Sequence, residues 1–185
     1  NTCTVRQKAH QKAFSEIGKA IQIKKSNIST SAHQHVRTLI AVCGCVAQDQ
    51  GAKLINRFPG IDLVFGPDQI YRLPELLEIV EETKKPVLAT ELVNNAEDYH
   101  FLDDVAAMKL SGPTAFITIM KGCNSRCSYC IVPKVRGTEV YRPAREIVKE
   151  VELLVEKGCR EVTLLGQNVN SYPDFAKLIR LISEN

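Results

Sequence analysis

Short apolar runs rich in β-branched residues alternate with amphipathic segments along much of this 185-residue chain. Runs at 38–42 and 62–65 are each followed by a segment with helical spacing, over 48–58 and 73–85. Buried strands separated by helices in this way form parallel sheets with helices packed on them. Ligands of such sheets bind beyond the carboxyl ends of the strands. The sequence therefore predicts an α/β fold and directs the search for a site to the segments that follow strands.

Residues 1–90 form the first of two predicted domains, a parallel α/β sheet. It opens with the end of a strand and a turn, where a threonine could cap an amphipathic helix expected over about 6–23. A further strand is expected over 87–90. The stretch 91–113 has turn-forming residues and no sustained helical period, which is typical of a linker.

The second predicted domain, 114–185, repeats a strand, a loop and a helix. Strands are expected at 115–120 and 161–165, and helices at 144–157 and from 175 onward. This repetition is typical of a (β/α) barrel, whose active site lies at the strand ends. Two such units cannot close a barrel, so we expect this domain to be only the first part of one.

Three cysteines with the spacing C-x3-C-x2-C follow the first strand of this domain: Cys123, Cys127 and Cys130. Iron–sulfur clusters are normally held by four cysteines, so three ligands leave one iron open to a ligand that is not protein. Core thiols or a structural zinc site are the alternatives, but no fourth cysteine or histidine follows at zinc-finger distance. The odd total of seven cysteines favours metal-bound thiolates in a reducing cytoplasm over a disulfide framework.

The loop after the second strand of this domain supplies Gly166, Gln167, Asn168 and Asn170. Glycine permits close backbone approach, and the amides could bind a polar small molecule. A plain turn is the alternative for this loop taken alone. Its place beside the cysteine loop favours binding.

Two further cysteines, Cys3 and Cys45, fall at predicted strand ends of the first domain and could meet in space. Cys43 and Cys159 are expected to be buried thiols without a metal.

The net charge of +3 is unevenly distributed. Residues 1–37 carry seven basic residues against one acidic, 38–113 six against twelve, and 114–185 eleven against eight. No apolar run approaches membrane length, and no signal-peptide pattern is present, so a soluble protein is expected. Basic residues near the cysteine loop could contact nucleic acid, unless they are ordinary surface charges. They include Lys121, Lys134, Arg136 and Arg142.

Four segments together resemble one family. Residues 122–139 read GCNSRCSYCIVPKVRGTE, which resembles the radical S-adenosylmethionine (SAM) enzymes and, within them, the methylthiotransferases. Residues 1–6 (NTCTVR) and 44–48 (GCVAQ) resemble two cysteine motifs of that family's N-terminal domain. Residues 161–172 (EVTLLGQNVNSY) are similar to the branch that modifies tRNA rather than the branch that modifies a ribosomal protein.

The resemblance implies two [4Fe–4S] clusters and a fold. Cys123, Cys127 and Cys130 would hold one cluster, whose open iron takes SAM, with the loop from Gly166 beside it. Cys3, Cys45 and a cysteine upstream of this sequence would hold the other. The fold implied is the methylthiotransferase N-terminal α/β domain, here without its first strand, followed by the first part of a radical SAM (β/α) barrel.

The implied activity is the addition of a methylthio group to isopentenyladenosine next to the anticodon of tRNA. An electron donor such as flavodoxin or ferredoxin and a cytoplasmic location are implied with it. Methylthiolation of a ribosomal protein, or a non-catalytic iron–sulfur or zinc module, are the alternatives. Lys134 and Val135 replace the Tyr-Thr pair expected before Arg136 and Gly137, and the family's C-terminal RNA-binding domain is expected beyond residue 185.

Overall fold

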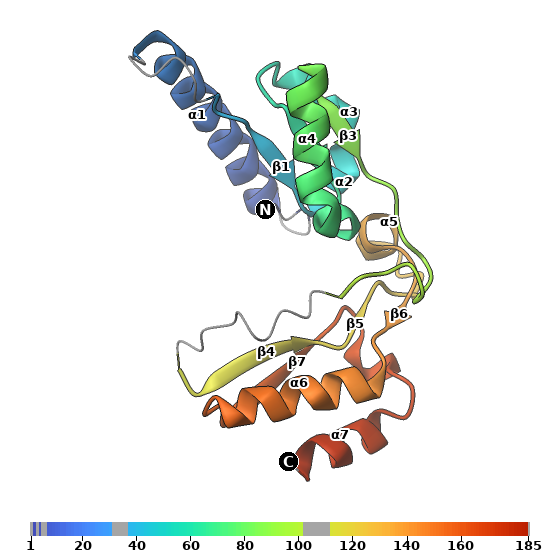
Figure 1. Ribbon diagram of the computed structural model, residues 1–185. Coiled ribbons are helices and arrows are strands. Elements are labelled where there is room, and N and C mark those ends of the chain that lie inside the picture. Colours follow the sequence, from blue (N-terminus) through green and yellow to red (C-terminus); the bar gives the residue numbers. More distant parts are fainter. Residues whose placement is uncertain (1, 3, 5–6, 31–36, 102–111, 185) are drawn as a thin grey trace. The chain divides into compact units, whose positions relative to one another are not determined.

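The computed structural model describes residues 2, 4, 7–30, 37–101 and 112–184, and Figure 1 shows the path of the chain. The chain divides into two compact units, Asn1–Leu92 and Val93–Asn185. No helix in these described ranges is long and apolar enough to cross a membrane.

The first unit contains a three-stranded parallel sheet in the order β1-β2-β3. Strands β1 (Ala41–Cys43), β2 (Leu63–Phe65) and β3 (Val87–Ala89) align Ala41 with Leu63 and Leu63 with Val87. All three residues of β2 are buried, as expected of a central strand with both faces covered. The predicted parallel sheet is confirmed, with strands shorter than the apolar runs.

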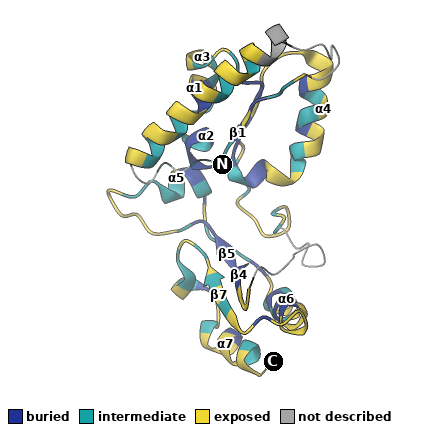
Figure 2. Ribbon diagram, turned by 90° about the vertical axis from the view of Figure 1, so that its left-hand side faces the viewer, coloured by how far each residue is buried: buried dark blue, intermediate teal, exposed yellow. Residues whose placement is uncertain are grey.

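The side chains of β2 alternate between two hydrophobic clusters. Val64 faces a cluster with Ile17 and Leu54, whereas Leu63 and Phe65 belong to one completed by α4. Layers of helix, sheet and helix therefore form around this strand. Figure 2 shows exposed residues along the outward sides of α1 and α4. The helices are α1 (Gln7–Thr30), α2 (Cys45–Gln50), α3 (Ala52–Arg57), the 3-10 helix η1 (Pro67–Arg72) and α4 (Leu73–Thr83).

The single helix predicted over 48–58 is wrong. Two short helices occupy this region, and the first begins at Cys45, directly after the strand. They are separated at Gly51, whose positive φ of 45° lies outside the helical range and whose N–H bonds the carbonyl of Ala47. Cys45 therefore lies in the first turn of a helix instead of in a loop.

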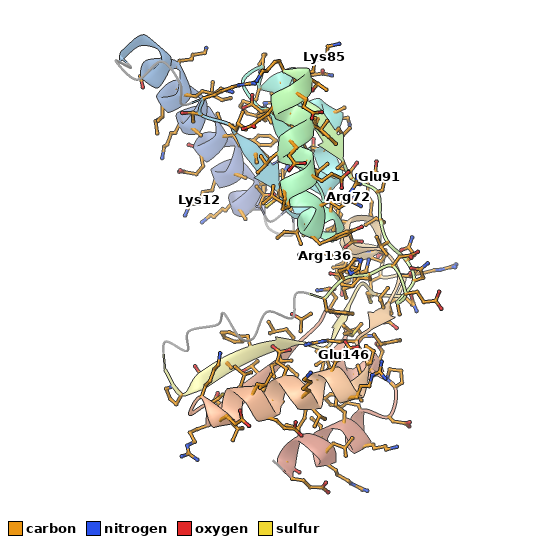
Figure 3. All side chains as sticks on the ribbon, in the orientation of Figure 1. Lys12, Arg72, Lys85, Glu91, Arg136 and Glu146 are labelled. Atoms are coloured by element: carbon orange, nitrogen blue, oxygen red, sulfur yellow. The ribbon has the colours of Figure 1, made fainter. Side chains whose placement is uncertain are left out.

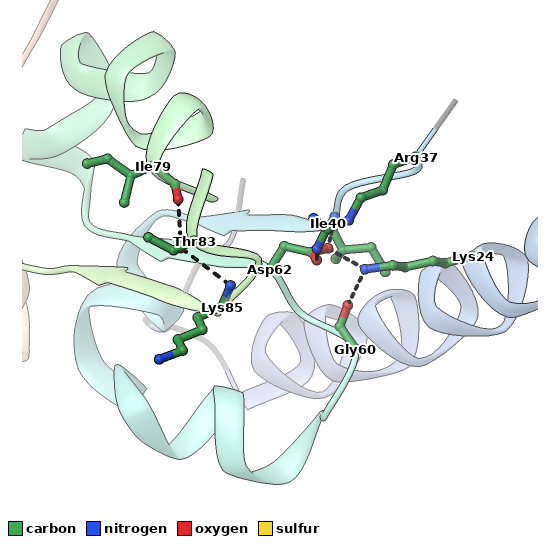
Figure 4. Close-up of polar contacts among 8 residues, drawn as sticks. All are labelled: Lys24, Arg37, Ile40, Gly60, Asp62, Ile79, Thr83 and Lys85. Atoms are coloured by element: carbon green, nitrogen blue, oxygen red, sulfur yellow. Dashed lines mark hydrogen bonds and ion pairs between the residues drawn. The ribbon is translucent and has the colours of Figure 1, made fainter. Parts of the chain in front are cut away.

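Asp62 anchors α1 to the start of β2 (Figure 4). Its carboxylate accepts hydrogen bonds from the ammonium of Lys24, from Arg37 at 3.0 Å and from the backbone N–H of Ile40 at 2.8 Å. Asp62 is 7% exposed, so these charged partners offset the cost of its burial. At the end of α4, the Thr83 hydroxyl donates to the Ile79 carbonyl.

In the second unit, β4 (Thr114–Thr118) and β7 (Glu161–Leu165) form a parallel pair, and β5 (Met120–Lys121) and β6 (Val140–Tyr141) form an antiparallel one. The strand predicted over 115–120 is therefore divided at Ile119. The Ile119 N–H bonds the Leu165 carbonyl, whereas the Ile119 carbonyl accepts from the Arg142 N–H. At this residue the chain changes partner strand.

One face of the β4–β7 pair carries the core of the second unit. Ile147, Val151 and Leu154 pack on this face with Ile117. The strand predicted over 161–165 is confirmed, but its residues alternate between exposed and half-buried instead of being buried. The helices of this unit are α5 (Val132–Arg136), α6 (Ala144–Glu156), the 3-10 helix η2 (Val169–Ser171) and α7 (Phe175–Ser183).

Residues 93–101, part of the predicted linker, pack on the second unit. The buried side chain of Lys121 donates a hydrogen bond to the Val93 carbonyl. Its ammonium also lies 4.7 Å from the ring centroid of Tyr99, within the range of a cation–π interaction. Lys121 thus belongs to the interior of this unit and not to the basic surface near the cysteine loop.

Candidate functional site

The three clustered cysteines lie on a loop without regular secondary structure, residues 122–131, between β5 and α5. Cys123 and Cys130 are half-buried, Cys127 is exposed, and all three are free thiols. The Cys130 N–H bonds the Cys127 carbonyl at 3.0 Å, which forms a tight turn between the last two cysteines. The loop therefore presents its thiols at the surface of the second unit.

Gly122 begins this loop in a conformation that suits glycine, with φ of 77°. A Cβ atom at this position would lie 1.9 Å from the carbonyl oxygen of Thr138. The next residue, Cys123, donates its N–H to the Gly137 carbonyl at 3.2 Å. The first cysteine is thus held against the segment that follows α5.

The loop after β7 lies beside the cysteine loop, as predicted. The Gln167 side-chain oxygen accepts a hydrogen bond from the Gly122 N–H at 2.6 Å. Gly166 approaches the Met120 side chain so closely that an added Cβ would lie 2.5 Å from its Cγ. Asn168 is half-buried and Asn170 is exposed. Gln167 thus supports the cysteine loop directly, and Gly166 packs against β5 just before that loop.

Glu139 joins both loops and was not among the predicted site residues. Its carboxylate accepts hydrogen bonds from Asn124 at 3.3 Å, from Asn168 at 3.2 Å and from the hydroxyl of Tyr141. The Ser171 hydroxyl donates instead to the Asn168 carbonyl, at 2.8 Å. Only its place at the end of the 122–139 motif could have indicated it in the sequence.

The pKa of Glu139 reflects these neighbours. Burial alone would raise the pKa of Glu139, but hydrogen bonds from Tyr141 and Asn168 outweigh burial and hold the pKa below its ordinary value. Burial, together with the hydrogen bond to Glu139, raises the pKa of Tyr141. Glu139 is therefore ionised at neutral pH while Tyr141 keeps its proton.

The predicted nucleic-acid contacts differ in exposure. Lys134 is exposed and Arg136 half-buried on α5, and Figure 3 labels Arg136 there and Glu146 on α6. Arg142 is 4% exposed and forms an ion pair with the buried Glu150. This burial contradicts the predicted contact of Arg142 with nucleic acid, because the guanidinium faces the interior.

Among the cysteines of the first unit, Cys45 is described and Cys3 lies outside the described residues. Cys45 is 8% exposed. Thr2 pairs in parallel with Gly44, and its carbonyl accepts the Cys45 N–H at 3.0 Å. The Thr2 hydroxyl accepts from the Val46 N–H at 3.2 Å, so it bonds a backbone donor in the first turn of α2.

The remaining two cysteines behave as core thiols. Cys43 is half-buried against the cluster that contains Leu63. Cys159 is 2% exposed and donates to the Glu161 carbonyl at 3.3 Å. Cys159 matches the expectation of a buried thiol, whereas Cys43 is only half-buried.

The kind and number of donors on the cysteine loop suit an iron–sulfur cluster with an open iron, although the described residues do not gather the three thiols as metal ligands. Cys123, Cys127 and Cys130 offer three free thiols from one accessible loop, whereas a structural zinc site takes four ligands. Within the part of the chain that the structure describes, no group of three or more His, Cys, Asp or Glu residues is arranged to hold a metal ion.

Comparison with known proteins gives matches over both units. Residues 117–185 match the model of the radical SAM superfamily, and residues 1–66 match that of uncharacterized protein family UPF0004. A curated relative from Ralstonia nicotianae is named tRNA-2-methylthio-N(6)-dimethylallyladenosine synthase. It is 40% identical over an alignment of 194 positions, which covers 100% of this chain and 40% of the relative.

Proteins of the same name from two other bacteria show similar sequence identity and coverage. The one from Pseudomonas aeruginosa (strain UCBPP-PA14) is 39% identical over 99% of this chain and 40% of its own length. The one from Paraburkholderia phytofirmans is 38% identical over 100% of this chain and 40% of its own length. The chain thus spans about 40% of the length of the curated relatives that it matches.

Proposed function

We propose that the whole protein adds a methylthio group to isopentenyladenosine next to the anticodon of tRNA. This proposal takes the chain as part of a radical SAM methylthiotransferase. The observation that carries this proposal is the hydrogen bond between Gly122 and Gln167, which joins the three-thiol loop to the loop after β7. The names of the curated relatives support tRNA as the substrate.

Cys123, Cys127 and Cys130 would hold a [4Fe–4S] cluster and leave one iron for SAM. When bound, the cluster supplies the electron that cleaves SAM. The residues of the protein bind SAM and orient it. Gly122 lets the chain turn sharply into the loop, and Gln167 holds its backbone. We propose that Gly166, Gln167, Asn168 and Asn170 face the bound SAM, with the exposed Asn170 best placed to donate to it.

Cys3 and Cys45, with a cysteine upstream of this sequence, would hold the second [4Fe–4S] cluster. Two contacts support this assignment. Thr2, the residue before Cys3, pairs with Gly44, and its carbonyl accepts the Cys45 N–H. The backbone next to Cys3 therefore lies against the start of α2.

Lys134 and Arg136 are the proposed contacts to the tRNA backbone, because both lie on α5 directly after the cysteine loop. Arg142 is left out, since its charge is paired inside the unit. An electron donor such as flavodoxin or ferredoxin and a cytoplasmic location are proposed with this activity. The domain limits proposed are 1–90, 91–113 and 114–185.

Iron counting on the full-length protein tests the cluster assignment. After anaerobic reconstitution, Cys127→Ala should lose about four irons per chain relative to the unchanged protein. Cys159→Ala, which removes a core thiol, is the matched control and should keep the full count. A Cys127→Ala protein with undiminished iron, or zinc in place of iron, would refute the assignment.

Nucleoside analysis tests the substrate. Mass spectrometry of tRNA from a strain lacking the gene should show isopentenyladenosine without its methylthio group, and the intact gene should restore the modification. Unchanged methylthiolated adenosine in the deletion strain would exclude tRNA as the substrate. A ribosomal protein that lost a methylthio group instead would identify the alternative substrate.

A further inference from the structure

The cysteine loop has little backbone structure of its own. Between Gly122 and Cys130, the described backbone bonds are those from Cys123 to Gly137 and from Cys130 to Cys127. A loop with so few internal bonds takes its shape from side chains that reach it from elsewhere. The side chains that contact its middle therefore decide where its thiols lie.

Asn124 is the point at which this loop is held from outside. Although exposed, its side chain makes a two-way pair with Glu139: the amide nitrogen donates to the carboxylate at 3.3 Å, and the amide oxygen accepts the Glu139 N–H at 3.1 Å. Asn124 lies between Cys123 and Cys127 in sequence. Fixing this amide therefore limits how the first two thiols can separate.

The other side of the Glu139 carboxylate holds the loop after β7. Its second oxygen accepts from the Asn168 amide at 3.2 Å, and the Tyr141 hydroxyl also donates to the carboxylate. Asn168 adjoins Gln167, whose side chain binds the Gly122 N–H. The two loops are thus tied at two separate points.

The donors that surround Glu139 are neutral, and a carboxylate suits them because it only accepts hydrogen bonds, at about four sites. A glutamine in its place would offer one accepting oxygen and one donating nitrogen. Whichever way that amide turned, its nitrogen would face the amide nitrogen of either Asn168 or Asn124. One bond of the tie would therefore be lost without a change in side-chain size.

We propose that Glu139 is a positioning residue, which holds the cysteine loop and the loop after β7 at a set spacing so that a ligand of the open iron contacts both. This inference rests on the proposed function, because it takes Cys123, Cys127 and Cys130 as cluster ligands and the loop from Gly166 as the SAM contact. Glu139 itself touches neither thiols nor SAM; it acts through Asn124 and Asn168.

The first test uses the full-length reconstituted enzyme. SAM is titrated into the reduced protein while the electron paramagnetic resonance spectrum of the loop cluster is followed. Glu139→Gln should raise the SAM concentration for the half-maximal spectral change about tenfold, as substitutions behind metal ligands commonly do, with iron content unchanged. Glu152→Gln, the same substitution at an exposed position of α6, should titrate like the unchanged protein.

The second test needs no cofactor. Hydrogen–deuterium exchange of the metal-free full-length protein should show faster exchange in Glu139→Gln for residues 122–131 and 166–171 together, and unchanged exchange in α6. Should Glu139→Gln fail to fold, Asn124→Ala removes one donor from the near side and should shift both measurements in the same direction.

The outcomes separate this inference from the proposed function. Suppose that the unchanged protein responds to SAM and that Glu139→Gln reaches its half-maximal spectral change at a SAM concentration within about twofold of the unchanged protein's. This result overturns the positioning role alone. Exchange that rises in only one of the two loops also overturns it, because a tie must release both. No spectral response to SAM in the unchanged protein overturns the proposed function and the inference with it.

Discussion

At the scale of single residues, two glycines share a positive φ but differ in their surroundings. Gly122 has φ of 77°, and an added Cβ would lie 1.9 Å from the Thr138 oxygen. Gly158, after the end of α6, has φ of 93° and no atom within 4 Å of such a Cβ. Comparing them separates the cost of backbone strain from that of a clash.

Gly158→Ala should lower the free energy of unfolding by about 1 kcal/mol, the cost of a positive φ in a residue with a side chain. Gly122→Ala should lower it by about 3 kcal/mol, because the Thr138 backbone must move as well. Urea unfolding of both variants measures the difference. Equal losses would show that residues 137–138 shift without cost.

Tyr172 offers a test that depends on pH. Its ring is 7% exposed, and its hydroxyl donates to the Arg142 carbonyl at 2.6 Å. Burial raises the pKa of Tyr172 above its ordinary value of 10.0, against a smaller opposing effect of the Arg142 charge. The neutral hydroxyl therefore stabilises the folded state fully below pH 10.0, and this stabilisation is lost as the pH rises through the folded-state pKa.

Tyr172→Phe should cost about 1–2 kcal/mol at neutral pH, since the Arg142 carbonyl loses its donor. The difference in unfolding free energy between Tyr172→Phe and the unchanged protein should shrink above pH 10.0. Denaturant titrations at pH 7 and above pH 10 measure it. A difference that stays constant or grows with pH would contradict the assigned cause.

At the scale of elements, α6 shows how a helix divides into a core side and a solvent side. Leu154 is 1% exposed and packs among Ile147, Val151 and Leu178, whereas the adjacent Leu153 is 36% exposed. The helical period of the apolar residues predicted this arrangement, because one face of a helix recurs every three to four residues.

Leu154→Ala should lower the free energy of unfolding by about 3 kcal/mol, because it leaves a cavity in a packed core. Leu153→Ala should cost less than about 1 kcal/mol, since its side chain already meets solvent. The two variants share composition and helix propensity, so their difference reports burial alone. Thermal or urea unfolding, followed by circular dichroism, provides the comparison.

The residues at which helices and strands end were harder to predict than whether a segment is a helix or a strand. The strands predicted from apolar runs are present and β6 was not predicted, but hydrogen-bond partners decide where each strand ends. Ile119 divides one apolar run because its N–H and carbonyl bond two different segments. Gly51 divides a predicted helix because it adopts a positive φ. Neither choice is visible in hydrophobic periodicity.

At the scale of the whole protein, the proposed tRNA contacts predict a dependence on salt. Replacing both Lys134 and Arg136 by alanine in the full-length enzyme should weaken tRNA binding and reduce the slope of log K against log salt by about 1–2, because fewer counterions are released. Lys149→Ala, an exposed lysine on α6, is the control and should leave the slope unchanged. Fluorescence anisotropy at several salt concentrations measures both.

An unaltered salt slope in the Lys134 and Arg136 double variant would exclude α5 as a contact to the phosphate backbone. A slope that falls equally in the Lys149 control would indicate a general effect of net charge. Cluster content and the SAM titration serve as checks that either variant is otherwise intact.

The sequence by itself determined the α/β class, the spacing of the cysteine loop and the matches to two family models, because each depends on the order of residues along the chain. Only the tertiary structure decided which charges are exposed and what holds the loops. Arg142 and Lys121 are buried, and Gly122 meets Gln167 across 45 positions. Contacts between residues so far apart depend on how strands and helices pack, which local patterns do not encode.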